Sequence, residues 1–319
     1  MIVRLGYVAI ALKLGKVTSS STLTYTRYNK LKNEEERIKK LKEITYSNIE
    51  DLEKILRYNI ENNIHFYRLT SNLIPLATHP EVMWNFIKYF EKDLKYIGKI
   101  IKESNMRVDA HPDQFNVVNS DKENVVKNTL RNLNMHVDIF EALDYKEGKL
   151  VLHVGGASGG KEKSIQRFID NVSNFPKRIT ERLILENDDK VFTAKEVLYI
   201  CNKTNMPMVL DVHHHNCKNE GECIEDLLNE IFDTWKNESL PPKIHFSSPR
   251  EFVNDRKHAD YINAIDFSNF LDIAKDKVDK DFDVMIEAKQ KDLTVEKLVN
   301  DLKLIRKDFK FIDNTTIEI

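Results

Sequence analysis

The chain has 319 residues, of which 41% are hydrophobic and only 9 are glycine and 8 proline, a composition that excludes an intrinsically disordered protein. Its 49 basic and 51 acidic residues give a formal charge of −2, so no general basic field attracts nucleic acid or an anionic membrane, and any polyanion must be held locally. The three cysteines show no Cys-x-x-Cys spacing, which argues against a disulfide framework or a cysteine zinc site. With no signal-peptide pattern and no membrane-length apolar run, we expect a cytoplasmic protein without a membrane partner.

Short apolar or β-branched runs predict eight β-strands, at residues 2–10, 64–70, 106–111, 149–155, 182–188, 207–213, 243–248 and 282–288. Helical spacing of apolar residues appears between them, most clearly at residues 48–62, 83–103, 124–143 and 195–203. Strict alternation of apolar strands with helices indicates a parallel sheet covered by helices, and eight repeats predict a closed (β/α)8 TIM barrel of the α/β class. No break in composition divides the chain, so we expect a single domain over residues 1–319. An open doubly wound sheet is the alternative, but no Gly-x-Gly-x-x-Gly follows the first strand.

Polar residues fall at, or one position from, the C-terminal ends of six predicted strands, the face where barrel enzymes carry their catalytic groups. They are His111, His153, Glu186, Asp211, His245 and Glu287. Any one of them is more easily understood as a core or loop residue, but six on one rim would be costly to bury unless they were paired or neutralised. Divalent metals neutralise such a set. Histidine with carboxylate ligands suits Mn, Zn, Fe or Mg, and shared carboxylates favour a multinuclear cluster.

Three consecutive histidines, His213, His214 and His215, follow the sixth strand, and strand alternation would place His213 on the same face as Asp211. Of the other histidines, His136 lies inside a predicted helix and is expected to be structural. His79 lies on the loop after the second strand, on the catalytic face, and is therefore a candidate site residue.

Several stretches occur in one order at the predicted strand ends: "RLGYV", "YRLTSNLIPLATHP", "DAHPDQFNVVNS", "LHVGG" with "GGKEKS", "LENDD", "DVHHH", "KIHFSSPR", "HADYI" and "MIEAKQKDL". Across most of its length the chain resembles the UV damage endonuclease family, relatives of endonuclease IV within the xylose isomerase-like barrels. The resemblance implies a DNA repair enzyme that nicks damaged double-stranded DNA 5′ to ultraviolet photoproducts, namely cyclobutane dimers and 6-4 photoproducts, and also acts at abasic sites.

The resemblance also implies a cluster of three divalent ions, for which we expect Mn²⁺, with Mg²⁺, Co²⁺ or Zn²⁺ as alternatives, and no organic cofactor. The ligands of the first ion would be His111, His153 and Glu186. Those of the second would be Glu186, Asp211, His245 and Glu287. Those of the third would be His214 and His258, with Lys243 close by. The family pattern Asp-x-x-His selects His214 over His213, and the implied catalytic groups are Glu186, Lys243, His245 and Glu287.

Lys243 lies two residues before His245, on the same face of the seventh strand, and should therefore face the metals. Desolvation and nearby cations both favour a neutral amine there, which can capture carbon dioxide. The family resemblance implies a carboxylated lysine at this position, an anionic ligand suited to the third ion. The alternative is an uncharged or phosphate-binding lysine.

Lesion recognition requires a side chain that separates damaged bases from the stack. The resemblance assigns this role to Gln114 and Phe115; some members carry Tyr at the second position, and Phe115 can stack but cannot donate a hydroxyl hydrogen bond. Tyr7 is a second candidate for stacking under flipped bases. Further candidate DNA contacts are His79, Lys161, Lys163 and Arg250. We expect a monomer; a metal-dependent sugar isomerase or epimerase and a non-catalytic DNA-binding scaffold are the alternative functions.

Overall fold

The computed structural model describes residues 1–319, and its central element is a closed barrel of eight parallel strands. The strands are β1 (Ile2–Val8), β2 (Phe66–Leu69), β3 (Arg107–Ala110), β4 (Lys149–His153), β5 (Leu183–Glu186), β6 (Met208–Asp211), β7 (Lys243–Phe246) and β8 (Phe282–Ile286). Each strand pairs in parallel with the next, and β1 pairs with both β8 and β2, which closes the barrel. The predicted (β/α)8 TIM barrel of the α/β class is therefore confirmed.

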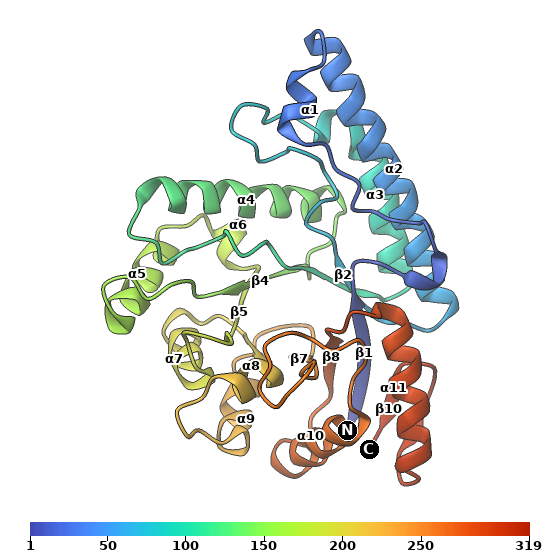
Figure 1. Cartoon of the computed structure of the whole chain (residues 1–319), viewed down its shortest axis with the longest axis vertical. Helices are drawn as coiled ribbons and strands as arrows, with labels where there is room; N and C mark the ends of the chain where they lie inside the picture. The colour runs from blue at the N-terminus through green and yellow to red at the C-terminus, as the bar shows by residue number, and fades with distance from the viewer.

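Helices surround the barrel, and the long helices α2 and α3 pack side by side at one edge of the molecule (Figure 1). The helices are η1 (Leu12–Leu14), α1 (Tyr25–Asn29), α2 (Glu34–Glu61), α3 (Ile87–Glu103), α4 (Glu123–Ala142), α5 (Lys161–Ser173), α6 (Lys177–Thr180), α7 (Ala194–Thr204), α8 (Val212–Cys217), α9 (Ile224–Asp233), α10 (Ala264–Lys277) and α11 (Lys291–Ile305). None of them has the length and apolar character needed to cross a lipid bilayer.

Capping residues explain where two of these helices begin. The Asn33 side chain accepts a hydrogen bond from the Glu36 backbone N–H, and three glutamates occupy the first turn of α2, where the helix dipole favours negative charge. Helix α2 therefore begins at residue 34, well before the predicted start at residue 48. Thr193 and Glu196 form a reciprocal capping box that fixes the start of α7.

A C-terminal hairpin, β9 (Lys310–Phe311) and β10 (Thr316–Glu318), lies outside the eight predicted strands. β10 pairs antiparallel with the first residues of β1, so the two chain ends lie side by side (Figure 1). Both strands are too short and too polar for an alternation pattern to reveal them. The hairpin extends the sheet at the bottom of β1, on the side of the barrel away from the C-terminal strand ends.

The boundary between β6 and α8 decides how the three histidines are oriented. β6 ends at Asp211, whose side chain accepts a hydrogen bond from the His214 backbone N–H at 2.7 Å and so caps α8. Because helical geometry begins at Val212, strand alternation does not govern the next residues, and His213 does not share a face with Asp211. One turn of helix instead brings His214 back beside Asp211.

Charged side chains occupy the barrel interior in layers below the C-terminal rim. In the lower layer, Asp283 binds Arg4 at 2.6 Å and Arg107 at 2.8 Å. In the next layer, Asp109 binds Lys243 and lies 3.6 Å from the Nε atom of Arg68. We call these six residues the interior charged layers. The main apolar cluster lies between the strands and the helices, and a separate small cluster comprises Val151, Ile184, Val209 and Trp235.

Candidate metal centre

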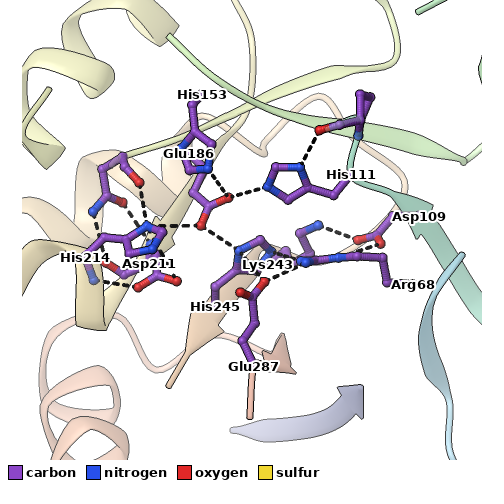
Figure 2. Close-up of polar contacts among 12 residues, drawn as sticks. Arg68, Asp109, His111, His153, Glu186, Asp211, His214, Lys243, His245 and Glu287 are labelled. Carbon is purple, nitrogen blue, oxygen red and sulfur yellow. Dashed lines mark hydrogen bonds and ion pairs between the residues drawn. The ribbon is translucent and has the colours of Figure 1, made fainter. Parts of the chain in front are cut away.

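Glu186, at the end of β5, lies at the centre of the rim and is 1% exposed. Its Oε2 atom lies 3.2 Å from His111 Nε2 and 3.7 Å from His153 Nε2. Its Oε1 atom lies 2.9 Å from His245 Nδ1 and 3.4 Å from His214 Nδ1. Figure 2 shows the carboxylate between these two pairs of imidazoles. A carboxylate whose two oxygens face separate ligand pairs can bridge two cations.

Three groups of side chains place ligand atoms within 4.8 Å of one another. The groups are His111 with His153 and Glu186, Glu186 with Asp211 and His214, and Asp211 with His245 and Glu287. The first group equals the ligand set expected for the first ion, and the third contains most of the set expected for the second.

His214 departs from the expected grouping, because it joins Glu186 and Asp211 rather than His258. His258 lies beside the centre but belongs to none of the three groups, and its ring centroid is 6.3 Å from that of His214. The structure thus brings together all the expected histidine and carboxylate ligands except His258.

Backbone carbonyls orient two of the histidines. His111 Nδ1 lies 3.0 Å from the Pro112 carbonyl, and His214 Nδ1 lies 3.0 Å from the Asn187 carbonyl. A carbonyl only accepts, so each Nδ1 carries the proton. In His111 this leaves the lone pair of Nε2, the atom that faces Glu186, free for a ligand, the usual arrangement of metal-binding histidines. In His214 the atom nearest Glu186 is Nδ1 itself. The Asn187 side chain also binds the backbone N–H and C=O of Asp211, at 2.8 and 3.0 Å. Sequence reasoning missed Asn187; its position directly after Glu186 was the available signal.

Arg68, on β2, was also missed, although a charged residue in a buried strand is a visible signal. It is 5% exposed and donates to Glu287 Oε1 at 2.6 Å and to His245 Nε2 at 2.7 Å (Figure 2). A guanidinium only donates, so the Nε2 atom of His245 must accept. Arg68 therefore fixes the ring of His245 with its Nδ1 atom toward Glu186.

Unpaired buried atoms show that the residues fit a cation. Asp211 Oδ2 and His153 Nδ1 are buried without a hydrogen-bond partner. Burial raises the pKa of Asp211 to about 8, and burial lowers the pKa of His245 to about 4. A buried carboxyl group with an unpaired oxygen is costly to leave alone, and a divalent ion would relieve that cost by binding the Asp211 carboxylate. Oxygen and nitrogen donors without sulfur suit a hard or borderline divalent metal.

Lys243 is fully buried in β7, and its Nζ atom binds Asp109. Burial lowers the pKa of this amine to about 8, against the opposing effect of Asp109. The lysine points into the barrel interior, where its amine contacts Asp109 rather than the expected His214 or His258.

Of the three residues expected to contact the DNA bases, one is buried and two are exposed. Tyr7 is 0% exposed, and its hydroxyl donates to Asn59 Oδ1 on α2 at 2.7 Å, between β1 and that helix, so its ring offers no face to a base. Gln114 and Phe115 are exposed on the loop after β3, and Phe115 is 77% exposed. The Phe115 backbone N–H binds the Asp113 side chain at 2.9 Å, which holds the tip of this loop.

The basic residues expected to contact DNA differ in whether they already form ion pairs within the protein. Lys161 binds Glu196 at 2.9 Å and Glu220 at 3.1 Å, so its charge is already balanced within the protein. Lys163 and Arg250 are exposed on the same rim. His79 stacks on Tyr25 with ring centroids 4.0 Å apart.

Fold and site together define the class: a TIM-barrel protein with a candidate centre for divalent metal at the C-terminal strand ends. The family model described as UV-endonuclease UvdE matches residues 3–317. The chain belongs to this family, and it is a DNA endonuclease, a hydrolase of phosphodiester bonds.

Similar proteins cover the whole chain. The UV DNA damage endonuclease of Bacillus cereus (strain Q1) is 41% identical over 319 residues, and that of Bacillus mycoides (strain KBAB4) is 42% identical over 319 residues, each alignment covering 100% of both chains. The crystal structure of SacUVDE is 36% identical with a TM-score of 0.84, covering 96% of this chain and 99% of that one. Endonuclease IV from Thermus thermophilus is 13% identical with a TM-score of 0.53, covering 80% of this chain and 93% of that one, and shares the fold alone.

Proposed function

We propose that this endonuclease repairs ultraviolet damage by nicking duplex DNA immediately 5′ to cyclobutane dimers and 6-4 photoproducts, and also at abasic sites. Its relatives at 41% identity are UV DNA damage endonucleases over their full length. The observation that carries the proposal is the central Glu186, whose two oxygens each face a different pair of histidines. This arrangement suits phosphodiester cleavage by grouped cations.

The proposed cofactor is a cluster of three divalent ions, with Mn²⁺ expected. The residues that would hold it are His111, His153, Glu186, Asp211, His214, His245, His258 and Glu287. When bound, such ions polarise the phosphodiester and ease deprotonation of the attacking water. They would also bring six positive charges to a chain whose formal charge is −2. A slightly acidic protein can then bind DNA at its active site.

The protein's own groups would position the ligands and the DNA. Arg68 holds Glu287 and the ring of His245, so neither side chain has to be ordered when substrate arrives. Lys163 and Arg250 are exposed on the rim and would contact phosphates on either side of the cut. Lys161 could join them only by leaving its two glutamates.

We also propose that Lys243 is carboxylated. Burial lowers its pKa to about 8, which makes the neutral amine accessible near neutral pH. The amine nitrogen would bond to the carbon of carbon dioxide and lose one proton, and the resulting carbamate would keep one N–H for Asp109. The ion pair with Asp109 is the competing arrangement, and labelled bicarbonate distinguishes the two.

A nicking assay tests the function. Purified protein with Mn²⁺ should cut a duplex carrying one cyclobutane dimer at the phosphate directly 5′ to it, and should leave the undamaged duplex intact. EDTA should abolish cutting, and elemental analysis should find three ions per chain. Binding without nicking in Mn²⁺ would support a DNA-binding scaffold instead. Turnover of ketoses without nicking would support the sugar epimerase alternative. Light scattering should show a monomer, alone and with DNA.

A further inference from the structure

The loop between β7 and α10, residues 247–263, ends in an exposed apolar tip. Phe252 is 65% exposed and Val253 is 84% exposed. Because the loop follows the C-terminal end of β7, it lies on the same rim as the candidate metal centre. On the rim that carries the candidate metal centre, these two adjacent side chains are placed to contact a bound molecule.

Internal contacts hold this loop in shape. Pro249 and His258 form an antiparallel bridge that closes its base. Asp255, only 6% exposed, accepts hydrogen bonds from the backbone N–H groups of Glu251 at 3.3 Å and Lys257 at 3.1 Å. A loop whose ends are bridged and whose interior is filled by its own carboxylate presents its tip at low entropic cost on binding.

Basic residues flank the apolar tip. Arg250 is 47% exposed, and its Nε atom is 3.9 Å from Glu251, while Arg256 is 54% exposed, with its Nε atom 3.5 Å from Asp189. Lys257 is exposed and forms no ion pair. An apolar tip between cations complements a molecule with stacked bases inside and phosphates outside.

The tip lies across the barrel mouth from Phe115. In the closed strand order β7 and β3 are separated by three strands in either direction, so the loops that follow them emerge on opposite sides of the centre. His258, at the base of the β7 loop, has its ring centroid 6.3 Å from that of His214, which places the loop directly at the edge of the centre. Two exposed apolar tips thus flank the proposed cutting site.

We propose that Phe252 and Val253 form a second probe that enters the duplex from the side opposite Phe115, and that Arg250, Arg256 and Lys257 hold the phosphates around it. The inference rests on the proposed function, since it takes damaged duplex DNA as the substrate. Two wedges on either side of the cut hold open a step that a single wedge would let restack, and they bend the duplex between them. Damage lowers the cost of opening that step, so the second contact adds to selectivity.

The decisive variant is Phe252→Ala combined with Val253→Ala, assayed on a duplex with one cyclobutane dimer. Loss of these contacts weakens substrate binding, so KM should rise roughly tenfold to a hundredfold. The chemical step does not involve these side chains, so kcat should stay within about threefold. Bound metal should be unchanged, since neither side chain is a candidate ligand. Leu304→Ala is the matched control, because Leu304 is 71% exposed in the last turn of α11, far from the rim, and its KM should equal that of the wild type.

A second readout observes insertion directly. The native Trp84 and Trp235 are 6% and 3% exposed, so an added tryptophan in Phe252→Trp dominates any change in emission. A dimer-containing duplex with a phosphorothioate at the scissile position should quench this emission more than the undamaged duplex does. If the wild type nicks damaged DNA and the double variant has the same KM as the wild type, the second probe is refuted while the proposed function stands. A wild type that neither binds nor nicks damaged DNA would refute the proposed function, and this inference with it.

Discussion

Replacing Arg68 by methionine tests whether this buried arginine stabilises the site through Glu287 and His245. Methionine keeps much of the length of the side chain but removes the donors that bind Glu287 Oε1 at 2.6 Å and His245 Nε2 at 2.7 Å. It also removes the positive charge 3.6 Å from Asp109. Breaking a buried ion pair by removing one partner costs about 3–5 kcal/mol, because the other charge remains buried and uncompensated. The free energy of unfolding of Arg68→Met in EDTA should fall by that amount.

Urea unfolding followed by circular dichroism measures this loss. Saturating Mn²⁺ should reduce it, because cations that bind the folded state neutralise Glu287 in place of the guanidinium. The matched control is Arg57→Met, which removes an exposed arginine whose Nη2 atom lies 2.7 Å from Glu53 and should cost about 0–1 kcal/mol. If Arg68→Met in EDTA lost no more stability than Arg57→Met, the buried role of Arg68 would be refuted.

The remaining predictions concern the metals, the lesion and pH. Glu186→Gln should abolish nicking and lower the bound metal while the circular dichroism spectrum is retained, and near wild-type cleavage would contradict the bridging role. Gln114→Ala with Phe115→Ala should lose discrimination between damaged and intact duplex in a binding titration before any metal is lost; equal discrimination would exclude the wedge. Native protein in labelled bicarbonate should show a carbamate signal by carbon NMR that disappears in Lys243→Met, and an active wild type without the signal would exclude carboxylation. Because burial lowers the pKa of His245 from 6.5 to about 4, the unfolded chain takes up this proton first as pH falls. In EDTA the wild type should therefore lose up to about 3 kcal/mol more stability than His245→Asn between pH 6.5 and pH 4, and parallel stability curves would refute the depressed pKa.

Periodicity predicted the barrel well because each strand is short, apolar and followed by a helix with a clear buried face. Glu186, Asp211 and Glu287 were recognised for the same reason, since a carboxylate at the end of an apolar strand is costly to bury unless a cation or a donor meets it. The hairpin at residues 310–318 was missed because pairing with a distant β1, rather than local pattern, makes it a strand.

The orientation of side chains was harder to predict than their location. Alternation favoured His213 beside Asp211, and only the cap that starts α8 brings His214 there instead. The sequence of β1 does not show whether Tyr7 points into the barrel or toward the helices. Its hydrogen bond to Asn59 shows that it points toward α2. Arg68 and Asn187 act through contacts with residues far apart in the chain, which no local pattern encodes.

The interior charged layers carry a consequence for protein engineering. Asp283 forms ion pairs with both Arg4 and Arg107. Asp109 pairs with Lys243 and lies close to Arg68, which in turn pairs with Glu287 on the rim. A substitution at one of these positions leaves its neighbours uncompensated, whereas joint replacement by apolar residues of similar volume can be tolerated. Beneficial changes here should therefore be found by libraries that randomise whole layers together, and position-by-position scanning should report nearly every change as harmful. Grafting the rim onto another barrel would require the layer formed by Asp109, Lys243 and Arg68 to be transferred with it.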